Sequence, residues 1–245
     1  MNNKDRDIAI NEIKQKIREH VWKEMEKRKI ARFPKPIKGR IPNFLGSEKA
    51  GEKISKIPAF LNARTVFSNP DSPQRVIRYL TLTLNKTLIM ATPKLKKGFL
   101  IIDGSRLTPS QKRRASTIRG AFEYGKKTDD LSSIEIDIKV TGSVATYYDG
   151  ARLGKGGGFS DLEFAILREM GSITDETPII TSIHYIQLVE GIPMTRHDVP
   201  VDIILTPTDI IKTNRKYEKP RGIYWDELPE DKITSIPILL KLRRS

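Results

Sequence analysis

Residues 65–91 read TVFSNPDSPQRVIRYLTLTLNKTLIMA, and they establish the class of the fold. Thr65–Ser68 and Thr87–Ala91 are short runs rich in apolar and β-branched residues, which favours two strands. Between them, Asn69–Pro73 supplies turn residues and the start of a helix that we expect to reach Leu84. Strand, helix and strand in this order are typical of a βαβ unit, whose strands lie parallel in one sheet.

The alternation of strands and helices continues toward the C-terminus. The further predicted elements are strands at Leu100–Ile102, Ile134–Val140, Ser143–Tyr147, Pro178–Ile183 and Val201–Leu205, a basic helix at Pro109–Phe122, and a helix through Leu162 and Met170 that ends at Gly171. Ser143–Tyr147 is expected to continue the sheet. We therefore predict a three-layer, Rossmann-like α/β fold with a mainly parallel sheet.

The segment before this core has a different pattern. Five apolar residues from Ile10 to Met25 recur at helical spacing, which predicts an amphipathic helix that ends before Phe33–Pro36. An extended arm through Gly39 and Pro42 and a short helix at Ser47–Lys56 are expected to follow. We treat the chain as a single domain with the helix and arm in residues 1–62, the α/β core in 63–211 and a C-terminal tail in 212–245.

Composition limits the classes of function. The chain of 245 residues contains no cysteine, which excludes disulfides, thiolate catalysis and cysteine-ligated metals. Its net charge of +14 indicates an anionic ligand or partner, although a solvated basic surface would explain the charge equally well. No apolar run is long enough to span a membrane, and residues 1–16 lack the apolar core of a secretory signal. We expect a cytoplasmic protein without membrane contact.

Residues 150–161, GARLGKGGGFSD, are the candidate ligand-binding loop. They lie between a predicted strand and a predicted helix, where open α/β sheets bind ligands. Glycines let backbone N–H groups approach phosphate oxygens closely, the helix adds its positive end, and Arg152 and Lys155 add charge. The alternative is a flexible loop without a ligand. The spacing of the glycines fits neither the P-loop nor the dinucleotide fingerprint.

A different motif fits this loop. Arg152-Leu153-Gly154-x-Gly156-x-Gly158-x-x-Asp161 resembles the signature of the 5-formyltetrahydrofolate cyclo-ligase family, also called methenyltetrahydrofolate synthetase, in which the loop holds ATP. Clear matching extends over roughly residues 86–207. Further stretches that resemble family motifs are Asp149-Gly150, His197-Asp198-x-x-Val201-Asp202 followed by Thr206, and Lys14-x-x-Ile17-Arg18.

The resemblance implies an ATP- and Mg²⁺-dependent enzyme. It would convert 5-formyltetrahydrofolate, or a related formylated reduced pterin, to the 5,10-methenyl form with release of ADP and phosphate. In the family, ATP phosphorylates the formyl oxygen and N10 of the folate then displaces phosphate, which depends mainly on positioning and charge neutralisation. The resemblance also implies catalytic roles for Lys14 and Arg152, and Mg²⁺ ligation by Asp161 and Asp198. The implied nucleotide-binding residues are Lys14, Arg18, Arg152, Gly154, Lys155, Gly156, Gly157, Gly158, Phe159, Ser160 and Asp161.

Several of these residues also have a purely structural interpretation. Asp161 is suited to the first turn of a helix, where the helix dipole favours a carboxylate. Asp198 is a common turn former, and His197 fits the edge of a strand. Lys14 and Arg18 fit an exposed helix surface.

The sequence departs from the family pattern in ways that predict a divergent branch. Phe159 and Ser160 stand where the family usually has two tyrosines. Residues 73–76, Pro-Gln-Arg-Val, contain no acid where the family has a glutamate that engages the pterin. The arm at Gly39–Phe44 and the tail at Lys212–Ser245 have no counterpart in compact family members.

The alternative function is a catalytically lapsed family member that acts as a nucleic-acid-binding or ATP-binding regulatory protein. Its support is the positive charge, from which we expect at least non-specific nucleic-acid binding. The basic clusters are Lys94, Lys96 and Lys97, then Lys112, Arg113, Arg114 and Arg119, then Lys126 and Lys127, and finally Lys241, Arg243 and Arg244. We expect a monomer or a small homo-oligomer.

Overall fold

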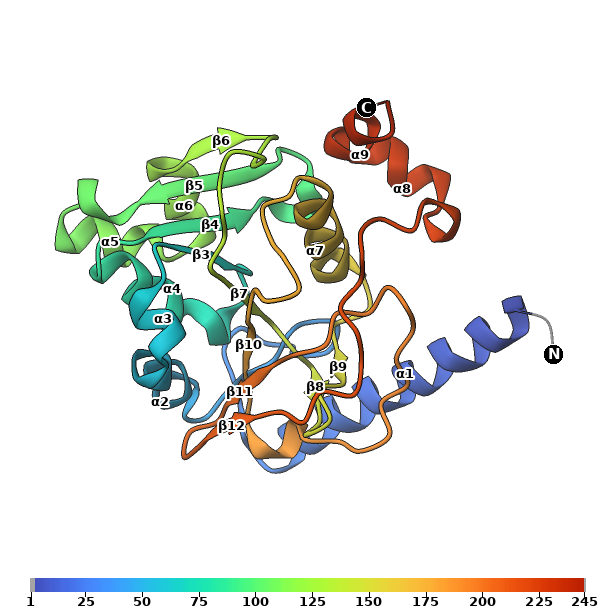
Figure 1. Cartoon of the computed structure of the whole chain (residues 1–245). Coiled ribbons are helices and arrows are strands. Elements are labelled where there is room, and N and C mark those ends of the chain that lie inside the picture. Colours follow the sequence, from blue (N-terminus) through green and yellow to red (C-terminus); the bar gives the residue numbers. More distant parts are fainter. Residues whose placement is uncertain (1–2, 245) are drawn as a thin grey trace.

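The structure is a computed structural model that describes residues 3–244. Its centre is an eight-stranded sheet in the order β12-β11-β10-β7-β3-β4-β5-β6 (Figure 1). The strands from β11 to β4 run parallel to their neighbours, whereas β12, β5 and β6 pair antiparallel at the two edges. The strands are β3 (Thr65–Ser68), β4 (Thr87–Ala91), β5 (Phe99–Asp103), β6 (Lys126–Thr128), β7 (Ile138–Thr141), β10 (Ile179–Ser182), β11 (Ile203–Leu205) and β12 (Ile210–Lys212). The predicted α/β class and mainly parallel sheet are confirmed.

Both faces of the sheet are covered, because successive residues of a strand point to opposite sides. Val66 and Ile180 belong to the apolar cluster on one face, and their neighbours Phe67 and Ile179 belong to the cluster on the other. The first cluster includes side chains of α3 (Pro58–Asn62) and α4 (Arg75–Thr83), and α2 (Ser47–Glu52) packs beside α4. The second cluster includes α7 (Phe159–Glu169). Layers of helix, sheet and helix result.

The antiparallel end of the sheet has its own helices. α5 (Pro109–Ala115) and α6 (Ile118–Tyr124) share an apolar cluster with β4 and β5. The sequence predicted one helix over Pro109–Phe122, and this is wrong. The Thr117 hydroxyl accepts a hydrogen bond from the Gly120 N–H at 3.1 Å and so caps the start of a second helix.

The N-terminal helix and the arm form a separate layer beside the sheet. α1 (Asn3–Lys27) is followed by β1 (Ala31–Arg32) and β2 (Asn43–Phe44), which pair antiparallel. The Trp22 indole N–H donates to the Arg40 carbonyl at 3.0 Å and ties the arm to the helix. Val21 and Met25 pack in a cluster with Leu153, so α1 lies against the strand that leads into the glycine loop. The predicted amphipathic helix and arm are therefore present.

Two predicted strands need correction. Ser143–Tyr147 does not continue the main sheet: β8 (Ala145–Thr146) pairs antiparallel with β9 (Arg152–Leu153) in a separate two-stranded sheet. The reason is that the Val144 N–H donates to the Leu153 carbonyl at 2.7 Å, so this stretch pairs with β9 and not with a strand of the main sheet. The strand expected from Ile134 begins only at Ile138, because the Ile136 N–H bonds the Ser172 carbonyl instead of a neighbouring strand.

Residues expected to form a tail are helical in part. α8 (Glu230–Ser235) and α9 (Pro237–Leu242) follow a long connection after β12. Ile233, Ile236 and Leu239 are buried in the same cluster as α7, so this end of the chain packs on the α7 side of the sheet (Figure 1). None of the helices between residues 3 and 244 is long and apolar enough to cross a membrane.

Candidate functional site

The glycine loop connects β9 to α7 and lies beside the ends of β3 and β7. It lines a cleft of about 610 Å³ together with the turn after β3 and part of the arm, including Arg40 and Ile41. Gly156 and Gly158 have φ angles of 105° and 64°, a left-handed conformation that side chains disfavour. Gly158 is the N-cap of α7. Glycine is therefore required for the course of the loop as well as for space.

The backbone of the loop offers donors to a ligand. Lys155–Gly158 are exposed, and within residues 3–244 none of their four N–H groups donates a hydrogen bond. The next residues form the first turn of α7, whose N–H groups also lack partners within the helix. Successive free N–H groups at a helix N-terminus attract anions, especially phosphate.

Arg152 holds this loop in place from inside the protein. Its side chain is buried and donates to the carbonyls of Val199 at 3.1 Å and Gly142 at 2.9 Å. It also forms an ion pair with Asp161. These bonds use the guanidinium inside the protein, so in this arrangement Arg152 orients Asp161 and the loop.

α1 contributes two predicted cations on one face, four residues apart. The Arg18 Nε donates to the Gly154 carbonyl at 2.8 Å, and the Lys14 Nζ lies 2.5 Å from Asp198 Oδ2. Burial lowers the pKa of Arg18, against the opposing effect of Asp198 and Asp161. The structure thus brings Arg18 to the glycine loop and Lys14 to Asp198. Lys14 is buried, which excludes the interpretation that it is an ordinary exposed charge.

The two predicted metal ligands lie at the same place and already have cationic partners. Asp161 Oδ1 accepts from Arg152 and from the Val199 N–H, and Asp198 Oδ2 accepts from Lys14 and from Thr195. Burial raises the pKa of Asp161, but the charge of Arg152 and the Val199 N–H outweigh it and hold this pKa below its usual value. Asp198 therefore also acts as a turn former, as one of the sequence interpretations expected.

The second oxygen of each of these two carboxylates differs from the first in its hydrogen bonding. Neither Asp161 Oδ2 nor Asp198 Oδ1 has a hydrogen-bond partner among residues 3–244. Within the same residues, no group of three or more His, Asp or Glu side chains is arranged to hold a metal by itself. A divalent cation at this place would take its remaining ligands from water or from a bound anion.

Lys155, Ser160 and His197 each contact a polar side chain from another part of the chain. Lys155 reaches across the mouth of the cleft to Asp71 at 3.2 Å. The Ser160 hydroxyl lies 2.6 Å from Thr141 Oγ1 and 3.0 Å from Asn69 Oδ1, which anchors the start of α7 to the sheet. His197 is exposed, and its Nδ1 lies 2.6 Å from a Glu227 carboxylate oxygen.

Comparison with known proteins identifies the family. The model of the 5-formyltetrahydrofolate cyclo-ligase family matches residues 10–207. The chain belongs to this family.

The chain is also similar to curated proteins and, in its fold, to a solved structure. The methenyltetrahydrofolate synthase domain-containing proteins of Bos taurus and Mus musculus are 40% and 41% identical to the chain over 235 residues, which is 94% of the chain in both cases. The chain spans 62% and 63% of their lengths, a little under two thirds. The NMR structure of Aquifex aeolicus 5,10-methenyltetrahydrofolate synthetase aligns with a TM-score of 0.50 at 16% identity, covering 88% of this chain and all of that one. It has the same fold.

Sequence reasoning missed an acidic residue that lines the cleft. Asp71, on the turn after β3, lines the cleft, and the fully buried Arg78 fixes this turn through the Asn69 and Asp71 carbonyls at 2.5 and 3.0 Å. Burial lowers the pKa of Arg78 to about 9. A signal was present, because the turn follows a parallel strand at its carboxyl end, where such sheets bind ligands.

A buried pair below the cleft was also missed. Glu163 on α7 accepts from Asn69 Nδ2 at 2.5 Å and lies 3.5 Å from the Lys139 ammonium, which is 4.3 Å from the Phe67 ring centre. Burial raises the pKa of Glu163 and lowers that of Lys139. No local sequence pattern predicts this pair, because its two residues lie on different elements, one in the middle of a strand and one on the inner face of a helix.

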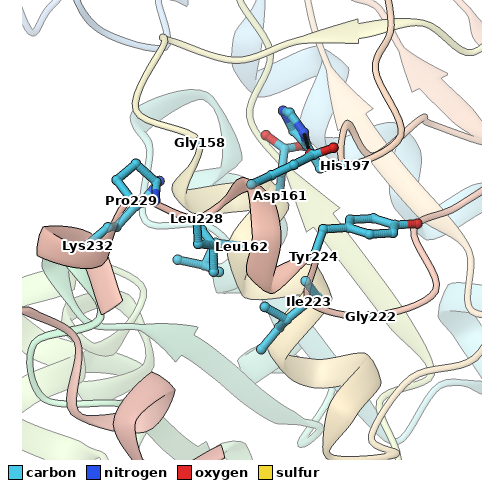
Figure 2. A pocket seen from close by; sticks show the side chains of 12 residues that line it. Gly158, Asp161, Leu162, His197, Gly222, Ile223, Tyr224, Leu228, Pro229 and Lys232 are labelled. Atoms are coloured by element: carbon cyan, nitrogen blue, oxygen red, sulfur yellow. Dashed lines mark hydrogen bonds and ion pairs between the residues drawn. The ribbon is translucent and has the colours of Figure 1, made fainter. Parts of the chain in front are cut away.

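The third missed feature is a contribution from the C-terminal end of the chain. A second pocket of about 130 Å³ lies between α7 and residues 222–232. Figure 2 shows Lys232 and Pro229 on one side of it, Asp161, His197 and Tyr224 on the other, and Gly158 at the loop. Residues 222–232 lie outside the stretch that matches the cyclo-ligase family model.

Proposed function

We propose that the chain is an ATP- and Mg²⁺-dependent 5-formyltetrahydrofolate cyclo-ligase. Its substrate would be 5-formyltetrahydrofolate or a related formylated reduced pterin. The formyl oxygen attacks the γ-phosphorus of ATP and ADP leaves. N10 then attacks the formyl carbon, the carbon–oxygen bond to phosphate breaks, and loss of the N10 proton gives the 5,10-methenyl product.

The observation that carries the proposal is the exposed backbone at Lys155–Gly158. Four N–H groups at the N-terminus of α7 have no partner in the described part of the chain, residues 3–244, and are suited to the oxygens of a polyphosphate. Arg18, bound to the Gly154 carbonyl, adds a positive charge at the edge of the loop. Family membership supports ATP as the nucleotide, because the glycine motif that the family model covers is this loop.

The donor set is compatible with Mg²⁺. This ion is commonly held by one or two carboxylates together with substrate phosphates, so a cage of three protein ligands is not needed. Asp161 Oδ2 and Asp198 Oδ1 would be the protein ligands, since Arg152 and Lys14 occupy the other oxygen of each carboxylate. The ion would neutralise phosphate charge there. Arg152 and Lys14 are then positioning residues for the two carboxylates.

The cleft of about 610 Å³ would take the pterin. Its polar lining includes Asp71, whose carboxylate suits the amino-pyrimidine edge of a pterin, a group that presents N–H donors. Lys155 is the present partner of Asp71, so a pterin bound there would compete for this carboxylate or share it. Asp71 would provide the acid that residues 73–76 lack.

Incubation of the purified chain with Mg²⁺, ATP and a panel of formylated reduced pterins tests the function. We expect ADP release that depends on the pterin and equals the 5,10-methenyl product, measured by its absorbance. Asp198→Asn should reduce turnover strongly, whereas Lys216→Gln, an exposed residue outside the site, should not. Nucleotide binding without any pterin-dependent ADP release would instead support the lapsed, ATP-binding alternative, for which Phe159 and Ser160 in place of two tyrosines are the motivating observation.

A further inference from the structure

The C-terminal segment, defined as residues 222–244, is firmly attached next to the glycine loop. The Ile223 N–H donates to Glu169 at the end of α7 at 2.8 Å, and Ile233 and Ile238 are buried in the cluster that contains α7. The segment therefore has a defined position over α7 (Figure 1). A side chain on it can be aimed at the start of that helix.

Lys232 is such a side chain. Its ammonium donates to the Gly157 carbonyl at 3.1 Å and lies 5.1 Å from the centre of the Phe159 ring. A Cβ placed on Gly158 would be 3.2 Å from the same nitrogen, which shows how closely Lys232 approaches the N-cap of α7. Arg18 reaches Gly154 of the same loop from α1. Two cations from opposite ends of the chain thus hold two carbonyls of one loop.

The position is electrostatically unfavourable for a cation in the absence of an anion. The N-terminus of a helix carries partial positive charge, which repels an ammonium group. Within residues 3–244 no carboxylate lies within ion-pairing distance of Lys232, and Asp161 and Asp231 attract its charge only from farther away. Burial lowers the pKa of Lys232, as expected for an ammonium group that loses water. An anion bound at the loop would give the Lys232 ammonium a close partner of opposite charge, which would offset both the helix dipole and the cost of burial.

We propose that Lys232 binds a phosphate group of the nucleotide at the glycine loop, which makes the C-terminal segment part of the nucleotide site. The inference rests on the proposed function, because it requires a nucleotide at this loop. A Lys ammonium is a compact point charge on a flexible stem, and the pocket beside Lys232 gives the stem room to move from the Gly157 carbonyl to a phosphate oxygen. The loop then receives cations from two sides.

Calorimetric titration of the full chain with Mg·ATP tests the assignment. We expect Lys232→Gln to raise the Kd about tenfold, as is typical for the loss of one charge-assisted hydrogen bond. Lys232→Arg should restore most of the affinity, because it keeps the charge. Lys216→Gln, which removes the same charge from an exposed site, should leave the Kd within about twofold of the wild-type value.

Two further measurements separate ligand binding from a structural role. Lys232→Gln should change the Kd for ATP strongly and the Kd for adenosine little. In a separate measurement, Mg·ATP should slow backbone hydrogen exchange in α8 of the wild type but not of the variant. A lower unfolding temperature with an unchanged Kd for Mg·ATP would make Lys232 a structural tie and overturn the proposal. If the wild-type chain binds no nucleotide, the proposed function fails together with this inference. If the wild type binds normally and Lys232→Gln binds equally well, this inference alone fails.

Discussion

Replacement of Arg152 by methionine should strongly destabilise the protein. The buried guanidinium bonds two carbonyls, those of Gly142 and Val199, and pairs with Asp161. Methionine fills much of the volume but leaves Asp161 without its cationic partner in a partly buried place. Loss of one partner of a buried ion pair typically costs about 3–5 kcal/mol of unfolding free energy. The unpaired carbonyls add to this loss, though not in full, because the site can relax and admit water.

Urea unfolding of the wild type, each single variant and the double variant Arg152→Met/Asp161→Leu measures this effect. Arg152→Met should lower the unfolding free energy by about 3–5 kcal/mol, equivalent to a fall in Tm on the order of 10 °C for a chain of this size. The double variant should be more stable than the sum of the single effects predicts, because it leaves no unpaired charge, by about 1–3 kcal/mol.

The control is Arg119→Met, which removes an exposed guanidinium from the surface of α6. Its unfolding free energy should change by less than about 0.5 kcal/mol. A loss below about 1 kcal/mol for Arg152→Met, or additive effects in the double variant, would refute the view that Arg152 anchors the loop through Asp161.

Three further predictions concern the loop, the pH dependence and the charge. Gly157→Leu should abolish the rise in Tm caused by Mg·ATP with little change in stability, because its backbone is outside the left-handed region and only the Phe159 ring is close; persistent stabilisation would contradict the loop assignment. Since its folded pKa is lowered, Asp161 should stabilise the fold above pH of about 4 and lose this effect as pH falls through its folded pKa. Asp161→Asn should therefore flatten the dependence of the urea midpoint on pH in that acidic window, and equal slopes would count against this. RNA binding should weaken steeply between low and physiological salt and show no sequence preference, whereas ATP affinity should change much less; a sequence-specific RNA retained at physiological salt would favour the regulatory alternative.

Some features of the fold follow from short-range patterns. β3 and β4 begin and end where the sequence predicted, because each is a short apolar run bounded by turn residues. The predicted end of α7 is also close, because the helix ends at Glu169, just before Gly171, whose φ of 70° suits glycine. Ser143–Tyr147 was misassigned because an apolar run does not reveal its partner: β8 pairs with β9, and its strand character alone was correct.

In the candidate site too, some residues were recognised from the local sequence and others only from the structure. The glycine loop was found from sequence because its glycines, charges and flanking elements are neighbours along the chain. The roles implied for Lys14 and Asp198 came only from family resemblance, and the contact between them spans 184 positions. Glu163 and Lys232 carry no local signal of their own, and the signal for Asp71 is only its place on a turn at the carboxyl end of a parallel strand.

The sequence by itself determined the α/β class, the family and the position of the glycine loop, because periodicity, turn chemistry and motif spacing are local properties. Only the tertiary structure decided which side chains surround that loop. Arg18 and Lys232 reach it across 136 and 75 positions of the chain. Whether such distant cations meet depends on how α1 and the C-terminal segment pack against the sheet. That packing is driven by the burial of apolar surface. Because this driving force has no direction, the local sequence does not show which residues will meet.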